Sequence, residues 1–271
     1  MTRPTNVLWI GGRSGAGKST VARLLARRHG LRWYSCDTKT WEHLDRAVAA
    51  GDPAAVEWAR LTPLQRSELP TVDKLRLTLD RTSMVLADVA GLLDRPAVIA
   101  EGTNVLPSMV PDGSCAVWLT AEPTIRAERT RQRGWGGAGG EIDLIRAREL
   151  QAEIDTARAT VIDTTHHTGV LDTVTMIETT AASWFASRPT ATSTAERRSL
   201  IREGNVAVVR QYRGGRARAG NTDTTGPVRS YDCECAADGC VALVQRALES
   251  FPDPFTSAAA PILAPEHRTA T

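Results

Sequence analysis

One glycine-rich stretch limits the folds open to this chain more than any other part of its sequence. It lies between a short apolar run at residues 7–10 and a segment of helical spacing from Thr20, and it reads Gly12, Arg13, Ser14, Gly15, Ala16, Gly17, Lys18 and Ser19. Glycines let the backbone turn tightly with its N–H groups inward, and the following helix adds the positive end of its dipole. The pattern Gly-x-x-x-x-Gly-Lys-Ser is the phosphate-binding loop, or Walker A motif.

Two residues give this loop the chemistry of a nucleotide site. The Lys18 ammonium can neutralise the β and γ phosphates, and the Ser19 hydroxyl can ligate Mg²⁺. The alternative is a glycine-rich turn with a chance Lys-Ser pair, but the preceding strand and following helix are the context that the motif requires. The sequence therefore predicts that residues 12–20 bind a nucleoside triphosphate together with Mg²⁺.

Short apolar runs alternate with helical patterns from residue 6 to about residue 187. Each run is apolar throughout, as strands buried on both faces are, and the runs are residues 7–10, 33–36, 97–100, 116–119 and 160–162. Strand and helix in alternation predict an α/β fold, with a doubly wound five-stranded parallel sheet and helices on both of its faces.

The composition changes beyond residue 188, and we predict four parts along the chain. These are an α/β domain, a linker rich in Pro, Thr, Ala and Ser, a small basic cysteine-containing module and a disordered tail, at residues 1–188, 189–196, 197–251 and 252–271. Within the module we expect a mobile loop over residues 213–227 and a helix over residues 241–251.

Charge and hydropathy exclude several classes of protein. A formal net charge of +2 over 271 residues excludes a globally cationic nucleic-acid binder. No apolar run approaches the roughly 20 residues of a membrane span, and residues 1–5 lack the order of a signal peptide. We therefore expect a cytoplasmic protein without a membrane contact, either a monomer or a homodimer, and the five cysteines do not predict a disulfide framework.

Residues 5–187 resemble the small P-loop kinases, which include nucleoside monophosphate kinases, shikimate and gluconate kinases and chloramphenicol phosphotransferase. The Walker A loop is the most specific motif of the resemblance. The resemblance implies the fold of a P-loop NTPase. It also implies an ATP- and Mg²⁺-dependent enzyme that moves the γ-phosphoryl group to a small-molecule acceptor.

Two acidic residues at strand ends match catalytic positions of that family. In its phosphotransferase-like members an Asp at the position of Asp37 is the base that faces the acceptor hydroxyl, and ligands of open α/β sheets do lie beyond the carboxyl ends of the strands. The alternative role of Asp37 is a helix cap. Glu101 matches the Walker B acid, which is usually Asp and holds Mg²⁺ through water or orients the acceptor. The alternative is that Glu101 ends its strand in a surface turn without a catalytic role. Asn104 follows within reach of the acceptor.

Arginines follow the fourth predicted strand, where these kinases carry a lid. Arg126, Arg129 and Arg133 are spaced to share one helix face, and guanidinium groups suit the charge on a transferring phosphoryl group. Residues 134–140 predict a glycine hinge. The alternative is a solvated helix, since all but three of the 33 basic residues are arginine. Asp163, at the fifth strand, matches a weaker family signal near the nucleotide base.

Residues 38–95 occupy the stretch that forms the acceptor-binding helices in the family. Trp41 and Trp58 suit a hydrophobic core better than a stacking surface, and Arg76 and Arg81 are candidates to bind an acceptor phosphate or carboxylate. Because a monophosphate needs several positioned arginines, an acceptor alcohol is favoured slightly over a nucleoside monophosphate.

Three cysteines cluster in the module. Cys233, Cys235 and Cys240 resemble a short knuckle, and their spacing suits a structural Zn²⁺ ion that would support a region poor in apolar residues. A fourth ligand is missing, because His267 is distant in sequence. The alternative is a set of reduced, partly buried thiols.

The basic segment at residues 197–218 raises a second hypothesis, a nucleotide-dependent regulatory module that engages an acidic partner such as RNA. Residues 196–218 hold seven arginines and two acidic residues. Asp37 and the lid-like arginines have no use in such a switch, and no long basic groove of a polynucleotide kinase is evident. We therefore favour the enzyme, with a small-molecule acceptor and no nucleic acid as its partner.

Overall fold

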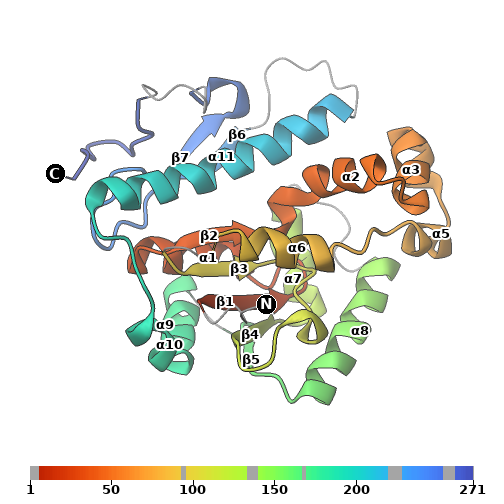
Figure 1. Ribbon diagram of the computed structural model, residues 1–271, viewed down its shortest axis with the longest axis horizontal. Coiled ribbons are helices and arrows are strands. Elements are labelled where there is room, and N and C mark those ends of the chain that lie inside the picture. Colours follow the sequence, from red (N-terminus) through yellow and green to blue (C-terminus); the bar gives the residue numbers. More distant parts are fainter. Residues whose placement is uncertain are drawn as a thin grey trace.

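The computed structural model describes residues 6–92, 96–132, 140–166, 169–218, 228–252 and 260–270, and within these ranges a five-stranded parallel sheet forms the centre (Figure 1). The strand order is β2-β3-β1-β4-β5. Each predicted apolar run lies on one of these strands, which are β1 (Val7–Gly12), β2 (Arg32–Ser35), β3 (Val98–Glu101), β4 (Cys115–Thr120) and β5 (Val161–Asp163). The predicted α/β class and doubly wound parallel sheet are confirmed.

Side chains of the strands alternate between two hydrophobic cores, one on each face of the sheet. Leu8 and Ile10 of β1 lie in one core, whereas Val7 and Trp9 lie in the other. Three helices cover the first face, namely α1 (Lys18–His29), α9 (Val170–Thr180) and α10 (Ala182–Ser187). The second face packs against α6 (Thr82–Ala90) and α8 (Glu141–Ala157). Burial on both faces explains the continuous apolar runs of the inner strands β1 and β3.

Several short helices follow the carboxyl end of β2. A 3₁₀ turn, η1 (Cys36–Lys39), leads into α2 (Thr40–Ala49), α3 (Pro53–Arg60), α4 (Pro63–Glu68) and α5 (Thr71–Arg76). A second 3₁₀ turn, η2 (Pro107–Met109), precedes β4, and α7 (Pro123–Gln132) follows it. Among the described residues, every helix is too short or too polar to span a membrane.

The long helix α11 (Thr194–Arg218) packs on the α/β domain instead of forming a separate module (Figure 1). It runs from β2 past η1 to α2. A Cβ atom on Gly204 would lie 3.0 Å from the Trp33 ring, and one on Gly215 would lie 3.0 Å from Trp41 Nε1. Glycine at these positions therefore lets α11 approach two tryptophans of the α/β domain.

The C-terminal region differs from prediction in two places. The helix expected over residues 241–251 is wrong: β7 (Leu243–Ala247) pairs antiparallel with β6 (Val228–Asp232), and the short η3 (Leu248–Ser250) follows. Pairing places Val244 against the cluster around buried Tyr231, so tertiary contacts override the helical pattern.

The expected disorder of residues 252–271 is wrong for residues 260–270. Ile262 is fully buried, and its carbonyl accepts a hydrogen bond from the Glu234 backbone at 2.7 Å. The Ala270 backbone donates to the Cys235 carbonyl at 2.9 Å. Of the expected mobile loop, residues 213–218 belong to α11, and residues 219–227 lie outside the described residues.

Candidate functional site

The loop between β1 and α1 has backbone φ angles that require glycine at three positions. Gly12, Gly15 and Gly17 have φ angles of 132°, 84° and 95°, which L side chains rarely adopt. A Cβ atom on Gly12 would lie 2.2 Å from the Leu119 carbonyl oxygen, and one on Gly15 would lie 2.5 Å from that of Arg126. The predicted loop is therefore formed in the structure, and close neighbours reinforce its need for glycine.

Lys18, the first residue of α1, lies across this loop. Its ammonium is buried and donates to the Arg13 carbonyl at 3.1 Å. Burial lowers the pKa of Lys18, while the nearby carboxylates of Asp37 and Glu101 oppose that shift. The two carboxylates thus help to hold a cation at the mouth of the loop.

Ser19 and Glu101 meet directly. The Ser19 hydroxyl donates to Glu101 Oε2 at 3.1 Å, and Glu101 is fully buried. Burial first, and then the charge of Asp37, raises the pKa of Glu101, whereas Lys18 opposes the rise. Among the described residues, Glu101 Oε1 has no hydrogen-bond partner. A hydroxyl beside an orphaned carboxylate oxygen is a donor set that fits Mg²⁺.

Asp37 lies in η1, directly after β2. Its Oδ1 accepts a hydrogen bond from the Thr103 hydroxyl at 3.2 Å. The cap position of α2 is Lys39, so in this part of the structure the Asp37 carboxylate does not serve as the helix cap that was its alternative role. The carboxylate instead faces the segment that follows β3.

The sheet order explains why these groups converge. β2, β3 and β1 are neighbours, and Glu101 at the end of β3 is in register with Ser35 of β2 and Ile10 of β1. The carboxyl ends of three parallel strands therefore deliver Asp37, Glu101 and the phosphate-binding loop to one edge of the sheet. A surface turn, the alternative for Glu101, does not agree with its complete burial.

Arg81 fixes the segment that carries Asp37. It is buried, and one guanidinium nitrogen donates to the Cys36 carbonyl at 2.8 Å and to the Thr40 hydroxyl at 3.0 Å. The Asn104 amide, with its oxygen turned toward Arg81, accepts from two further guanidinium nitrogens, both at 3.1 Å. Arg81 thus joins η1 to the turn after β3, a positioning role that the sequence did not indicate.

Arg126 approaches the loop from α7. Its guanidinium donates to the Ser14 carbonyl at 3.2 Å and pairs with Asp143 at 2.9 Å, and both side chains of that pair are about 5% exposed or less. Arg13 pairs with the same carboxylate at 2.9 Å. Asp143, on α8, was not singled out in the sequence because no local pattern marks a residue 130 positions from its partner Arg13.

Arg129 contacts the next carbonyl of the loop. It donates to the Gly15 carbonyl at 3.4 Å and to the Thr164 carbonyl at 2.9 Å. The Asp163 carboxylate accepts from the backbone and hydroxyl of Thr165, as a residue that closes a local turn does. The third predicted lid residue, Arg133, lies outside the described residues, as does the glycine hinge except for Gly140.

The candidate acceptor residues divide between core and surface. Trp41 packs against the end of α11, where the Arg218 guanidinium lies 5.2 Å from its ring, and Trp58 belongs to the same small core. Arg76 is exposed and bonds both carboxylate oxygens of Glu57. Both tryptophans are half-buried and pack against this small core, which agrees with the core role that the sequence favours.

The cysteine cluster has a fourth candidate ligand. The structure places His267 beside Cys233, Cys235 and Cys240, with all four ligand atoms within 4.8 Å of one another. Spacing did not reveal this residue, because 27 positions separate it from Cys240.

Comparison with known proteins gives a family and several relatives. The model of a family described as an AAA domain matches residues 8–154. A bifunctional pantoate ligase/cytidylate kinase of Trichormus variabilis is 29% identical over 180 residues, which cover 55% of this chain and 34% of that protein. A cytidylate kinase of Sinorhizobium medicae is 27% identical over 138 residues, which cover 45% and 65%. The chain thus spans about a third of the length of the first relative.

Solved structures give more distant likenesses. A shikimate kinase from Acinetobacter baumannii is 19% identical with a TM-score of 0.42, over 67% of this chain and 94% of that one. A gluconokinase from Sinorhizobium meliloti is 18% identical with a TM-score of 0.39, over 68% and 95%. The family match and the cytidylate kinases among the curated relatives confirm the similarity to small P-loop kinases that the sequence motifs indicate.

Proposed function

The chain belongs to the AAA domain family, and from this premise we propose that it is a P-loop kinase that transfers the γ-phosphoryl group of ATP to a hydroxyl of a small molecule. One observation carries the proposal: Lys18, Ser19, Glu101 and Asp37 meet at the ends of three adjacent strands. A cation, an oxygen donor set for a metal and a second carboxylate are the groups that phosphoryl transfer requires.

Each residue has a role that follows from its contacts. Lys18 neutralises the phosphates after it leaves the Arg13 carbonyl. Ser19 and Glu101 would hold Mg²⁺, which supplies positive charge to the phosphate oxygens when bound. Asp37, oriented by Thr103, accepts the proton of the acceptor hydroxyl.

The arginines of α7 hold the phosphate-binding loop in place. Arg126 and Arg129 donate to the carbonyls of Ser14 and Gly15, so the loop amides can face the opposite way, toward a polyphosphate. Catalysis of this kind depends on positioning and on fixed charges, and it needs no covalent intermediate. The loop is braced before substrate arrives, which reduces the reorganisation that binding would require.

A second candidate function is a nucleoside monophosphate kinase, which the relatives named as cytidylate kinases favour. Recognition of a monophosphate relies on arginines with free donors. Arg81 directs its guanidinium to protein groups, and Arg76 is engaged by Glu57. Because both arginines are bonded to groups of the protein, we rank a hydroxyl acceptor above a nucleoside monophosphate as the substrate.

A coupled ADP-release screen on the intact chain tests both candidates. The panel holds nucleosides, sugars, hydroxy acids, antibiotics and nucleoside monophosphates including CMP, and Lys18→Ala is the blank. Mass spectrometry of each product separates a new phosphate ester from a nucleoside diphosphate. ADP release that is equal in the blank for every acceptor would refute the kinase proposal.

The regulatory hypothesis loses its main support in the structure, because the basic segment uses its charge internally. Arg202 pairs with buried Glu234 at 2.6 Å. Four more of its arginines bond groups of this chain, namely Arg197, Arg198, Arg216 and Arg218. We therefore propose that α11 is a structural element and not a surface for an acidic partner.

A further inference from the structure

The four ligand atoms at the C-terminal cysteine cluster have the spacing of a tetrahedral metal site. His267 Nδ1 lies 3.4 Å from Cys233 Sγ and 3.7 Å from Cys240 Sγ. With Zn–S bonds of about 2.3 Å and Zn–N bonds of about 2.0 Å, tetrahedral angles put sulfur and nitrogen about 3.5 Å apart. The observed separations agree with that value.

The backbone around the cysteines is arranged to hold them. The Ala264 amide donates to Cys233 Sγ at 3.3 Å and the Ala237 amide to Cys235 Sγ at 3.5 Å. Amide donors to sulfur stabilise thiolates in metal sites. Ala236 and Gly239 have φ angles of 59° and 72°, and these left-handed residues turn the chain back so that its cysteines face one another.

We propose that Cys233, Cys235, Cys240 and His267 bind one zinc ion as a closed, structural site. Three thiolates and one imidazole are soft and borderline donors that select zinc over Mg²⁺ or Ca²⁺. All three cysteines are free of disulfides in the structure. Because four protein ligands complete the tetrahedron, the ion supports the fold and performs no hydrolysis.

The ion joins two segments that are distant in sequence. Three ligands follow β6, and the fourth lies in the last described segment, residues 260–270. The Ala270 carbonyl accepts a hydrogen bond from Arg198 of α11 at 2.9 Å. Zinc at this position therefore fastens the C-terminal segment beside α11.

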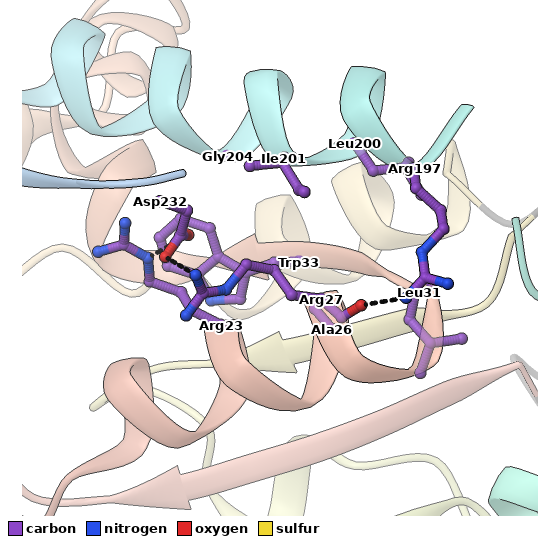
Figure 2. Close-up of a pocket in the computed structure, with 11 residues that line it drawn as sticks. Arg23, Ala26, Arg27, Leu31, Trp33, Arg197, Leu200, Ile201, Gly204 and Asp232 are labelled. Atoms are coloured by element: carbon purple, nitrogen blue, oxygen red, sulfur yellow. Dashed lines mark hydrogen bonds and ion pairs between the residues drawn. The ribbon is translucent and has the colours of Figure 1, made fainter. Parts of the chain in front are cut away.

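The same site adjoins a contact with the helix of the phosphate-binding loop. Cys233 follows Asp232, and Figure 2 shows Arg23 and Arg27 of α1 directed at the Asp232 carboxylate, with α11 on the opposite side. The ion pairs measure 2.8 and 3.3 Å. The zinc ion thus holds the end of β6 in the position from which Asp232 reaches α1.

Metal analysis of the intact chain, purified without chelators, is the first test. We expect about one zinc ion per chain, as for a closed structural site. His267→Ala should lower the zinc affinity at least about tenfold in competition with a chromogenic chelator, while the matched control His166→Ala, at an exposed histidine, should not. Cys240→Ser should also lose zinc, and Cys115→Ser, outside the cluster, should retain it.

Cobalt provides a readout of the ligands themselves. Co²⁺ added to the metal-free chain should give thiolate charge-transfer bands and the intense visible bands of a tetrahedral ion. The visible bands should weaken in His267→Ala and regain intensity in His267→Cys, which restores four protein ligands. Circular dichroism identifies any variant that is unfolded. If a variant is unfolded, the zinc content and cobalt spectrum of the wild-type protein decide the proposal.

Two results would overturn the proposal. One is wild-type protein that lacks zinc and gives no tetrahedral cobalt spectrum. The other is a folded His267→Ala variant that binds zinc as tightly as the wild type.

Discussion

The phosphate-binding loop and the cysteine cluster each assemble a binding site, but they do so from opposite kinds of sequence. The loop takes its backbone, its lysine and its hydroxyl from eight consecutive residues, 12–19. The cluster needs His267, which lies 27 positions beyond Cys240. A site formed by consecutive residues can be recognised from the sequence alone. A site formed by residues far apart in the sequence can be recognised only in the folded structure.

The two regions also differ in what stabilises them. The phosphate-binding loop lies at the carboxyl end of a sheet whose two faces are covered by large cores. A carbonyl of the loop also accepts a hydrogen bond from α7. The C-terminal region has a smaller core around Tyr231 and Ile262. Small cores commonly depend on a metal ion or a similar restraint, so the difference gives a physical reason for a zinc site in one region alone.

Under the proposed function the loop carries the phosphate-binding charge and the C-terminal region does not, so the largest effect is expected for Lys18→Ala. Loss of a principal phosphate charge should lower kcat/KM on the order of 10⁴-fold, as removal of other charged groups does in phosphoryl transfer. Coupled ADP release measures the change. Arg28→Ala, a half-exposed cation at the far end of the same helix, is the control and should retain activity. Equal losses in both variants would remove Lys18 from the mechanism.

Asp37→Asn should have the next largest effect on catalysis. It preserves shape but not basicity, so kcat should fall on the order of 10²–10³-fold while ATP binding persists. Steady-state kinetics and calorimetry with magnesium nucleotide separate the two. Asp155→Asn, at an exposed carboxylate of α8, is the control. Full turnover by Asp37→Asn would show that another group accepts the proton.

Asp143→Ala tests how much the buried ion pair beside the phosphate-binding loop contributes to stability. It leaves Arg126 buried without its partner, and the free energy of unfolding should fall by about 3–5 kcal/mol. Urea denaturation measures this loss. Glu149→Ala removes an exposed pair with Arg146 and should cost less than about 1 kcal/mol. Similar losses in the two variants would contradict a special role for the buried pair.

Asp232→Ala tests whether the two regions act independently. Loss of its bonds to Arg23 and Arg27 should lower the free energy of unfolding by about 1.5–3 kcal/mol, the smallest effect of the four. Because Asp232 contacts no group of the proposed active site within the described part of the chain, kcat below the melting temperature should not change. Asp238→Ala, at a largely exposed carboxylate, is the control. A large fall in kcat for Asp232→Ala alone would show that the C-terminal region tunes the loop.

Sequence reasoning succeeded where local pattern and tertiary environment agree. The apolar runs of β1 and β3 are buried throughout, and the short apolar runs of the sequence predict all five strands. It failed at residues 241–251, where a helical pattern forms the strand β7 because β6 supplies a partner. It failed again at residues 260–270, whose order depends on Glu234, Cys235 and α11 and not on their own composition.

The amino-acid sequence by itself determined the class of fold, the phosphate-binding loop and the acidic residues that end β2 and β3. These properties depend on periodicity and on the backbone freedom of glycine, which act over a few residues. Only the tertiary structure decided that Asp143 braces Arg13 and Arg126, that Arg81 orders the segment around Asp37, and that His267 joins three cysteines. Those contacts form between groups far apart along the chain, and local residue preferences carry no information about which distant partners a packed fold will bring together.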